Sequence, residues 1–415
     1  MMALEDLRFV ETVDVYKGDI HAGTLQRIAD GSTAFTYRDE YRDDPSLPDL
    51  AFTLPRSAPS ATAPQGALPP FFAGLLPEGV RLAAVLAGTR TSADDQLTLL
   101  LAVGQDAVGD VGVVPAGSDW PPHAEVIDEA TIPSRNLEEV FANAVSADPE
   151  LFERVALPGV QPKVSAMMWS TPLPTMTGPA ILKLNPPRDF PHLIDNEAFF
   201  LRMAHDCGLP VPTARVVTDQ GGARGLLVER FDRVVTEGGV TRLAQEDGCQ
   251  LLGRYPADKY RVKTENVARA VAEAVELGNG SRPLALLRLV QLVAFSYLVG
   301  NGDLHAKNIS VSMSRQGIWG LTPAYDLLST QPYVGWRDPM ALDFYGRANR
   351  IDRAHLVTAA GRLGVPGAAV RRMLDAMCQA AESWLERVDE IGLDAKPTTL
   401  LRDLLRSRLI ELGSA

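Results

Sequence analysis

The residues best suited to chemistry lie in one short segment, NGDLHAKN, at positions 301–308. It contains an acid, an imidazole, an amine and an amide, a set that fits a metal site, a proton relay, a phosphate site or a solvated loop. The segment before it, residues 284–300, is strongly apolar and predicts a buried helix. Because such a helix would carry these polar groups into the protein, we expect them to have a function there.

Asp303 and Asn308 have the spacing D-x-x-x-x-N. In protein-kinase-like phosphoryl transfer, the Asp accepts the proton of the attacking hydroxyl and the Asn binds magnesium. Asp326, in PAYDLLS, follows a predicted hairpin at 308–326 and has the place of a second magnesium carboxylate. Taken singly, Asp303 would be a turn residue and Asn308 a cap. The ordered set of three favours the catalytic interpretation.

Lys183 is a further candidate, because it stands in the predicted strand AILKLN at residues 180–185. A lysine in a buried strand is costly unless a phosphate or a carboxylate receives its charge. Nucleotide phosphates would do so, and so would Glu197, which lies on a helix predicted over residues 196–210. The simpler alternative is a solvent-facing lysine on an alternating strand. The downstream Asp–Asn–Asp set favours the buried role.

Two other segments could contact a nucleotide. LLVERFDR, residues 226–233, is an apolar strand that enters a connector, as at a kinase hinge, and Glu229 and Phe231 are the candidates to meet adenine. An edge strand with an exposed Glu and a packed Phe is equally compatible. GVQPK, residues 159–163, has neither a G-x-x-x-x-G-K-[ST] nor a G-x-G-x-x-G spacing. It predicts either a plain hairpin or a phosphate-covering loop. The residues that such a loop would supply are Gly159, Gln161 and Lys163.

The remaining polar residues have less specific roles. His305 has no second His or Cys nearby to complete a metal site, so we expect it to hydrogen-bond and shape the loop beside the nucleotide. Lys307 could neutralise the transferring phosphoryl group. Glu246 and Asp247 stand at a predicted helix start, where capping and packing are the preferred explanation.

The elements that must position these residues change in type along the chain. The first part predicts an antiparallel meander, a flexible stretch and helices, and a boundary follows. The meander is expected at residues 10–38 and the flexible stretch at 55–70. The helices are expected at residues 71–88 and 97–104, and the boundary at 119–123. Residues 155–170 predict two strands around a turn, and residues 171–179 predict another turn. Beyond residue 240 the pattern is mainly helical apart from the hairpin. The fold class expected is therefore α+β, with a β-rich half before a helical half.

The composition is that of an ordinary globular protein, with 46% hydrophobic and 22% charged residues in a chain of 415. A net charge of −12 argues against non-specific binding to nucleic acid. The apolar run at 284–300 is interrupted by Arg288 and Gln291 and is short for a membrane span. The few, scattered cysteines and the absence of a signal-peptide pattern predict a soluble cytoplasmic protein. The cysteines are Cys207, Cys249 and Cys378.

Together these motifs resemble, in order and over essentially the whole chain, those of HipA-like serine/threonine kinases. The matching segments are VYKGDIHAGTL, FFAGLLPEG, GVQPK, AILKLNPP, PHLIDNE, GLPVP, LLVERFDR, QEDGCQ, NGDLHAKN and PAYDLLS. DLHAKN with PAYDLLS is the most specific part. Members of this family are the toxin halves of bacterial type II toxin–antitoxin pairs.

The resemblance implies a two-lobed kinase-like fold in three parts. An N-terminal subdomain would cover residues 1–120, the rest of the β-rich N-lobe 121–232, and a helical C-lobe 233–415. It also implies ATP and Mg²⁺, and a protein hydroxyl as acceptor, such as one on an aminoacyl-tRNA synthetase. The expected partner is a HipB-like helix-turn-helix antitoxin, through which the toxin would sit on operator DNA.

The resemblance also assigns roles by motif match. Asp303 becomes the catalytic base, Asn308 and Asp326 the metal ligands, and Lys183 the ATP-phosphate lysine, while Glu229 and Phe231 become the adenine-side hinge. One position departs from the family: Ala156 stands where many members have an autophosphorylated serine. Self-inactivation at that position is therefore not expected.

Two other functions are compatible with the sequence. A kinase-like small-molecule phosphotransferase would use the same Asp–Asn–Asp set on another acceptor. A catalytically weak protein could act mainly as a co-repressor with an antitoxin, although the intact set argues against it.

Overall fold

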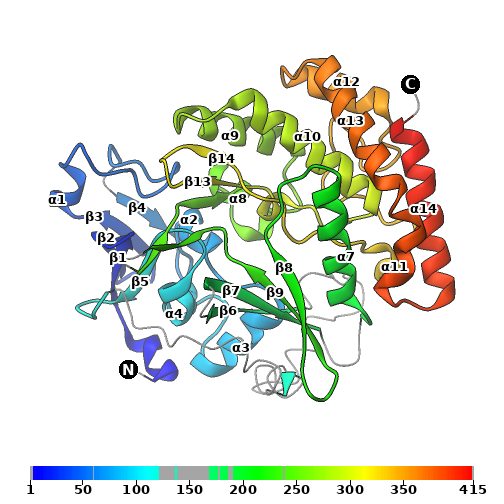
Figure 1. The fold of residues 1–415 in the computed structure, drawn as a ribbon. Coiled ribbons are helices and arrows are strands. Elements are labelled where there is room, and N and C mark those ends of the chain that lie inside the picture. The colour runs from blue at the N-terminus through cyan, green and yellow to red at the C-terminus, as the bar shows by residue number, and fades with distance from the viewer. Residues whose placement is uncertain are drawn as a thin grey trace.

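The computed structural model describes residues 3–58, 60–120, 136–137, 168–175, 178–185, 190–236 and 239–413. Three parts follow one another along the chain (Figure 1): a first antiparallel sheet with short helices, a second antiparallel sheet with one long helix, and a bundle of helices. This arrangement confirms the predicted α+β fold with a β-rich N-terminal part and a helical C-terminal part.

The first part, here called the N-terminal subdomain, is built on a five-stranded sheet of order β4-β3-β2-β1-β5, in which all pairs are antiparallel. Alternating residues such as Val13, Val15 and Phe35 face a common core with Phe72 and Leu97. The strands are β1 Thr12–Lys17, β2 Ile20–Arg27, β3 Thr33–Tyr37, β4 Ser60–Ala63 and β5 Val111–Pro115. The helices are η1 Leu4–Phe9, α1 Asp39–Arg42, α2 Pro70–Gly74, α3 Gly79–Thr89, α4 Gln96–Val103 and η2 Gly104–Asp106.

The predicted helix over residues 71–88 is wrong as a single element, because α2 and α3 are separate helices. Pro77 lies between them and has no backbone N–H to continue the first helix. Gly79, the first residue of α3, has a positive φ of 54°, so the backbone changes direction where α3 begins.

The second sheet has the order β6-β7-β9-β8 and is also antiparallel. Its strands are β6 Trp169–Thr175, β7 Gly178–Leu184, β8 Ala214–Thr218 and β9 Arg224–Glu229. The turn predicted over residues 171–179 is wrong, because residues 171–175 belong to β6. Among the described residues β6 is the outermost strand of this sheet, and its prolines, Pro172 and Pro174, are of the kind that outer strands tolerate. Helix α7, Leu193–Asp206, begins three residues before the predicted start.

The last part packs helices around α10, and its described strands form two small sheets, β10-β11 and β12-β13-β14. The helices are α8 Gly248–Leu251, η5 Pro256–Asp258, α9 Thr264–Leu277, α10 Arg282–Val299, η6 Ala306–Asn308, α11 Gln331–Val334, α12 Arg353–Arg362, α13 Gly367–Glu382, η7 Leu385–Ile391 and α14 Ala395–Gly413. The strands are β10 Arg233–Thr236, β11 Gly239–Arg242, β12 Gln245–Asp247, β13 Ser310–Met313 and β14 Trp319–Leu321. The antiparallel pair β13–β14 confirms the predicted hairpin.

Helix α10 is long and apolar enough to cross a membrane by length and composition, but 67% of it is buried inside the protein. In Figure 1 it runs among α9, α13 and α14, and its residues belong to the main hydrophobic core. It is therefore the central helix of this lobe, and its C-terminal end delivers the segment NGDLHAKN.

Candidate active site

A pocket lies between the second sheet, the helical lobe and the N-terminal subdomain. It contains most of the residues that the sequence singled out. Those that line it are Lys183, Glu229, Phe231, His305, Lys307, Asn308 and Asp326. Three predicted phosphate-contacting residues, Gly159, Gln161 and Lys163, lie outside the described residues, as does Ala156.

Lys183 reaches the pocket because of the alternation along β7. Ala180, Leu182 and Leu184 face a small hydrophobic core on one side of the sheet, so Ile181 and Lys183 face the pocket on the other. The Lys183 Nζ donates to Glu197 Oε1 of α7 at 2.6 Å and also to Asp326 Oδ1. The pairing predicted with Glu197 is thus present in the structure.

This lysine remains charged although it is buried. Burial alone would lower the pKa of Lys183, but the carboxylates of Asp326 and Glu197 raise it above its ordinary value. The pocket therefore contains a protonated ammonium, paired with two carboxylates, that could contact a phosphate group.

Asp326 has a strained backbone, with φ at +53°. A non-glycine residue in this left-handed region costs about 1 kcal/mol, so the surrounding structure must hold it there. One such restraint is Asn301, whose Nδ2 donates to the Asp326 carbonyl oxygen at 3.3 Å. The side chain is 26% exposed and turned into the pocket.

The loop that carries Asp303 and Asn308 is held by its own polar groups. Asp303 N–H donates to Asn301 Oδ1 at 3.0 Å, and the Asp303 carbonyl accepts from Asn308 Nδ2 at 3.0 Å and from His305 N–H at 2.8 Å. Asp303 itself is only 3% exposed, and it lies two residues before His305, which lines the pocket. The D-x-x-x-x-N spacing thus closes one compact turn.

A tyrosine that the sequence analysis missed contacts this acid. Tyr260 Oη donates to Asp303 Oδ1 at 2.7 Å, and its ring stands edge-on to His305 with centroids 5.0 Å apart. Burial, followed by the positive charge of Lys259, lowers the pKa of His305 to about 3, so the imidazole is neutral. His305 therefore packs against Tyr260 and lines the pocket, but its Nδ1 makes no hydrogen bond to any described residue, so the predicted hydrogen bond from that nitrogen is not seen. Nothing in the local sequence around Tyr260 indicates this role.

Lys307 lies on the side of the pocket nearest the N-terminal subdomain. Its Nζ donates to Asp247 Oδ2 at 2.8 Å and to the Gly74 carbonyl at 2.7 Å. Asp247 also caps α8 by accepting from the N–H groups of Cys249 and Gln250, as the sequence predicted. Burial would lower the pKa of Lys307, but Asp247 and Glu78 raise it. Its predicted contact with a phosphoryl group stays a prediction.

The donor set fits a magnesium–nucleotide complex. Asn308 uses its Nδ2 to hold Asp303, and its Oδ1 makes no hydrogen bond to any residue that the structure describes. That oxygen and the Asp326 carboxylate are hard ligands on one pocket, as Mg²⁺ prefers in phosphate sites. Two oxygen donors beside a charged lysine would leave the remaining positions to phosphate oxygens and water.

Two lobes, a buried Lys–Glu pair and an acid–amide loop define a protein-kinase-like fold and site. Family models match over two ranges: the HipA N-terminal domain at residues 13–114 and the HipA-like C-terminal domain at residues 155–385. The chain belongs to the HipA family. The resemblance seen in the sequence is thereby confirmed.

Curated relatives cover most of the chain. Y4mE of Sinorhizobium fredii (strain NBRC 101917 / NGR234) is 29% identical over 97% of this chain and 99% of its own length. Y4dM of the same strain is 31% identical over 81% of each chain. The "Serine/threonine-protein kinase toxin HipA" of Shewanella oneidensis is 28% identical over 86% of this chain and 84% of its own.

The fold has a solved counterpart as well. HipA of Shewanella oneidensis MR-1, solved in a complex with HipB and its operator DNA, superposes with a TM-score of 0.76. The match covers 96% of this chain and 97% of that chain at 21% sequence identity. It shows that the whole architecture, including the N-terminal subdomain, is that of HipA.

Proposed function

We propose that this protein is an ATP- and Mg²⁺-dependent protein serine/threonine kinase and the toxin of a type II toxin–antitoxin pair. The observation that carries the proposal is the buried Lys183–Glu197 pair, with Asp326 on the same ammonium and Asn308 and Asp303 beside it. Kinases use such a lysine and glutamate to hold nucleotide phosphates in line for transfer.

Each part of the site has one task in this proposal. Lys183 binds the nucleotide phosphates, while Glu229 and Phe231 lie at the connector where adenine would bind. Asp303 accepts the proton of the acceptor hydroxyl as the new O–P bond forms and the bond to the ADP oxygen breaks. Asn308 and Asp326 would hold magnesium, which supplies charge neutralisation at the phosphate oxygens when bound.

The biological setting is supported by the relatives. The Shewanella HipA is named a serine/threonine-protein kinase toxin, and its solved complex contains HipB and operator DNA. We therefore place this protein in the cytoplasm with a HipB-like helix-turn-helix antitoxin, through which it co-represses its operon. An aminoacyl-tRNA synthetase is the proposed acceptor, since phosphorylating it would arrest translation.

The test is transfer of the γ-phosphate of labelled ATP to protein acceptors in a lysate. Asp303→Gln replaces the carboxylate by a neutral amide that cannot accept the proton, so transfer should fall at least about a thousandfold. Asp403→Asn, an exposed change on α14, should leave transfer unchanged. Undiminished transfer by a folded Asp303→Gln protein would overturn the proposal.

A further inference from the structure

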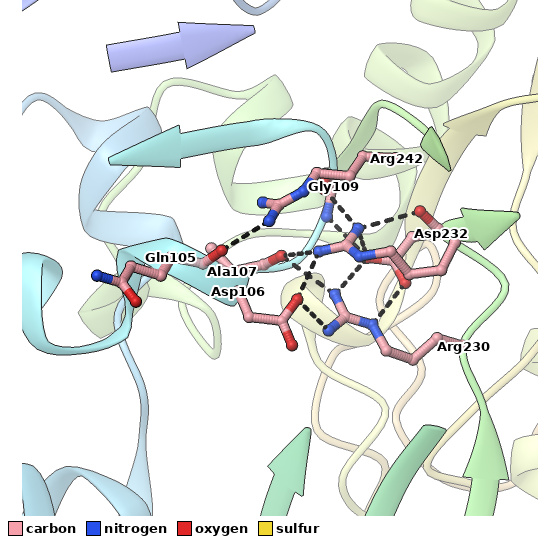
Figure 2. A network of polar contacts seen from close by, with 8 residues as sticks. Gln105, Asp106, Ala107, Gly109, Arg230, Asp232 and Arg242 are labelled. Carbon is pink, nitrogen blue, oxygen red and sulfur yellow. Dashed lines mark hydrogen bonds and ion pairs between the residues drawn. The ribbon is translucent and has the colours of Figure 1, made fainter. Parts of the chain in front are cut away.

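A buried network of charges joins the connector after β9 to the N-terminal subdomain (Figure 2). Arg230 lies between Glu229 and Phe231 in the sequence. Its side chain points toward the loop at residues 104–109, where it contacts Asp106 and Ala107. That side chain is only 3% exposed. The loop connects α4 to β5, so it belongs to a part of the protein that is distant in sequence.

Two arginines hold this loop at the same two atoms. Asp106 Oδ1 accepts from Arg230 Nη1 at 2.8 Å and from Arg233 Nη2 at 3.0 Å. The Ala107 carbonyl accepts from Arg230 Nη2 at 3.1 Å and from Arg233 Nη2 at 2.6 Å. Because these charged donors bind both a carboxylate and a buried carbonyl, they fix the position and the orientation of the loop at residues 104–109.

Asp232 completes the network from the connector side. Its carboxylate accepts from Arg230 Nε at 2.9 Å and Nη2 at 2.8 Å, and from Arg233 Nη1 at 2.9 Å. It also accepts from the Gly109 N–H at 2.9 Å. Burial would raise the pKa of Asp232, but Arg230 and Arg233 keep it below its ordinary value. Two buried guanidinium groups therefore face two carboxylates, of which Asp232 is buried and Asp106 is 45% exposed, and removing either charge weakens the pairing.

The loop held in this way is itself part of the pocket. Asp106, Ala107 and Val108 line it together with Glu229 and Phe231. The Val108 side chain is 46% exposed, which leaves an apolar surface free at the edge of the pocket. A planar base needs an apolar wall as well as the backbone of the connector.

We propose that the loop at residues 104–109 forms an adenine-side wall of the nucleotide site, with Asp106 as the positioning residue that fixes the connector against it. The inference rests on the proposed function, because it assumes that the pocket binds ATP. A displaced connector would weaken adenine binding, whereas Asp303 and Lys183 would keep their places. The effect should therefore fall on the affinity for ATP and spare the transfer step.

The test compares ATP binding and kinetics in matched variants. In Asp106→Asn, both the Kd and the KM for ATP should rise about tenfold, with kcat within about twofold of the wild type. Asp110→Asn is the control, because Asp110 pairs with Lys17 at 2.9 Å inside the N-terminal subdomain and does not line the pocket. It should leave all three constants unchanged.

Arg242→Gln is a milder second variant. It removes the bond from Arg242 Nη2 to the Gln105 carbonyl at 2.7 Å (Figure 2) and touches none of the pocket, so the Kd should rise about threefold. Folding of each variant is checked by thermal unfolding, and Arg242→Gln decides the case if Asp106→Asn does not fold. An unchanged Kd in the folded variants, or an equal rise in Asp110→Asn, overturns the inference. A wild-type protein that binds no ATP would instead refute the proposed function.

Discussion

At the scale of single residues, Asp303 depends on a tyrosine from a different loop. The Tyr260 hydroxyl donates to Asp303 Oδ1 at 2.7 Å. Burial, followed by the nearby Asp303 carboxylate, raises the pKa of Tyr260, so the phenol stays protonated and remains a donor. Because Asp303 must point one oxygen at the acceptor hydroxyl, this bond to its other oxygen would set its orientation.

Tyr260→Phe should lower kcat about tenfold, because it removes one hydrogen bond to a charged group while the ring keeps its packing. The KM for ATP should not change, since Tyr260 does not line the pocket. Steady-state kinetics with ATP varied would measure both. Tyr255→Phe, on the same loop but without a hydrogen bond from its hydroxyl to any described residue, is the control. An unaltered kcat in Tyr260→Phe would contradict the orienting role.

The residues that sequence reasoning found share one property: their chemistry is visible locally. Asp303 and Asn308 lie within one loop, and a lysine in an apolar strand such as Lys183 demands a partner. Glu197 was found because it lies on the next helix. Tyr260 was missed because it is 43 residues from Asp303, and no periodicity connects the two. Arg230 and Asp106, 124 residues apart, were missed for the same reason.

At the scale of elements, the end of α10 determines where the catalytic loop starts. Gly300 ends the helix with φ at +74°, and its N–H donates to the carbonyl oxygens of Ser296 and Tyr297 in the last helical turn. A Cβ at this position would lie 2.6 Å from Gln331 Cγ of α11, which is closer than packing allows. Only glycine therefore satisfies both the backbone angle and the close approach.

Gly300→Ala should destabilise the protein by about 1–3 kcal/mol, from the left-handed backbone plus the contact with Gln331. Gly317→Ala is a matched control: its φ is +76°, but a Cβ there would meet nothing within 4 Å. It should cost only about 1 kcal/mol. Urea unfolding of the two variants measures the difference. Equal losses in the free energy of unfolding would show that the Gln331 side chain moves away from the new Cβ at no cost.

The elements were predictable where hydrophobic periodicity was unbroken, as in α10 and the β13–β14 hairpin. They were not predictable where a proline is compatible with either a turn or a strand. The prolines of β6 suggested a turn, although β6 lies at the end of the strand order among the described residues, a position where a strand can accommodate proline. Whether a strand lies at an edge is a property of the whole sheet, so the segment alone could not reveal it.

At the scale of the whole molecule, the N-terminal subdomain is bonded to the helical lobe as well as to the connector. Gln250 Nε2 donates to the Phe71 carbonyl at 3.0 Å, and Lys259 pairs with Glu78. Glu246, 3% exposed, accepts from the Phe52 N–H at 2.9 Å. Burial raises the pKa of Glu246 to about 7, since Phe52 and Lys17 offset it only in part while Asp247 and Asp110 add to it.

This carboxyl should make the stability of the protein depend on pH. A folded-state pKa raised above the unfolded value adds stability that is complete below about pH 4.5 and is lost as pH rises through about 7. In Glu246→Gln the side chain is neutral at every pH. The fall in the free energy of unfolding between pH 5.5 and pH 8 should therefore be smaller by about 1–3 kcal/mol than in the wild type. Urea unfolding at both pH values measures this. The exposed Glu273→Gln should leave the pH dependence intact, and an unaltered slope in Glu246→Gln would refute the assignment.

In the proposed function, Asp303 is the base for phosphoryl transfer to a serine or threonine of another protein. Phosphoproteomics on cells that express the wild-type chain, beside cells that express Asp303→Gln at equal levels, tests it most directly. We expect one or a few proteins, a translation component among them, to gain phosphoserine or phosphothreonine only with the wild type. Identical phosphoproteomes in the two strains would contradict it.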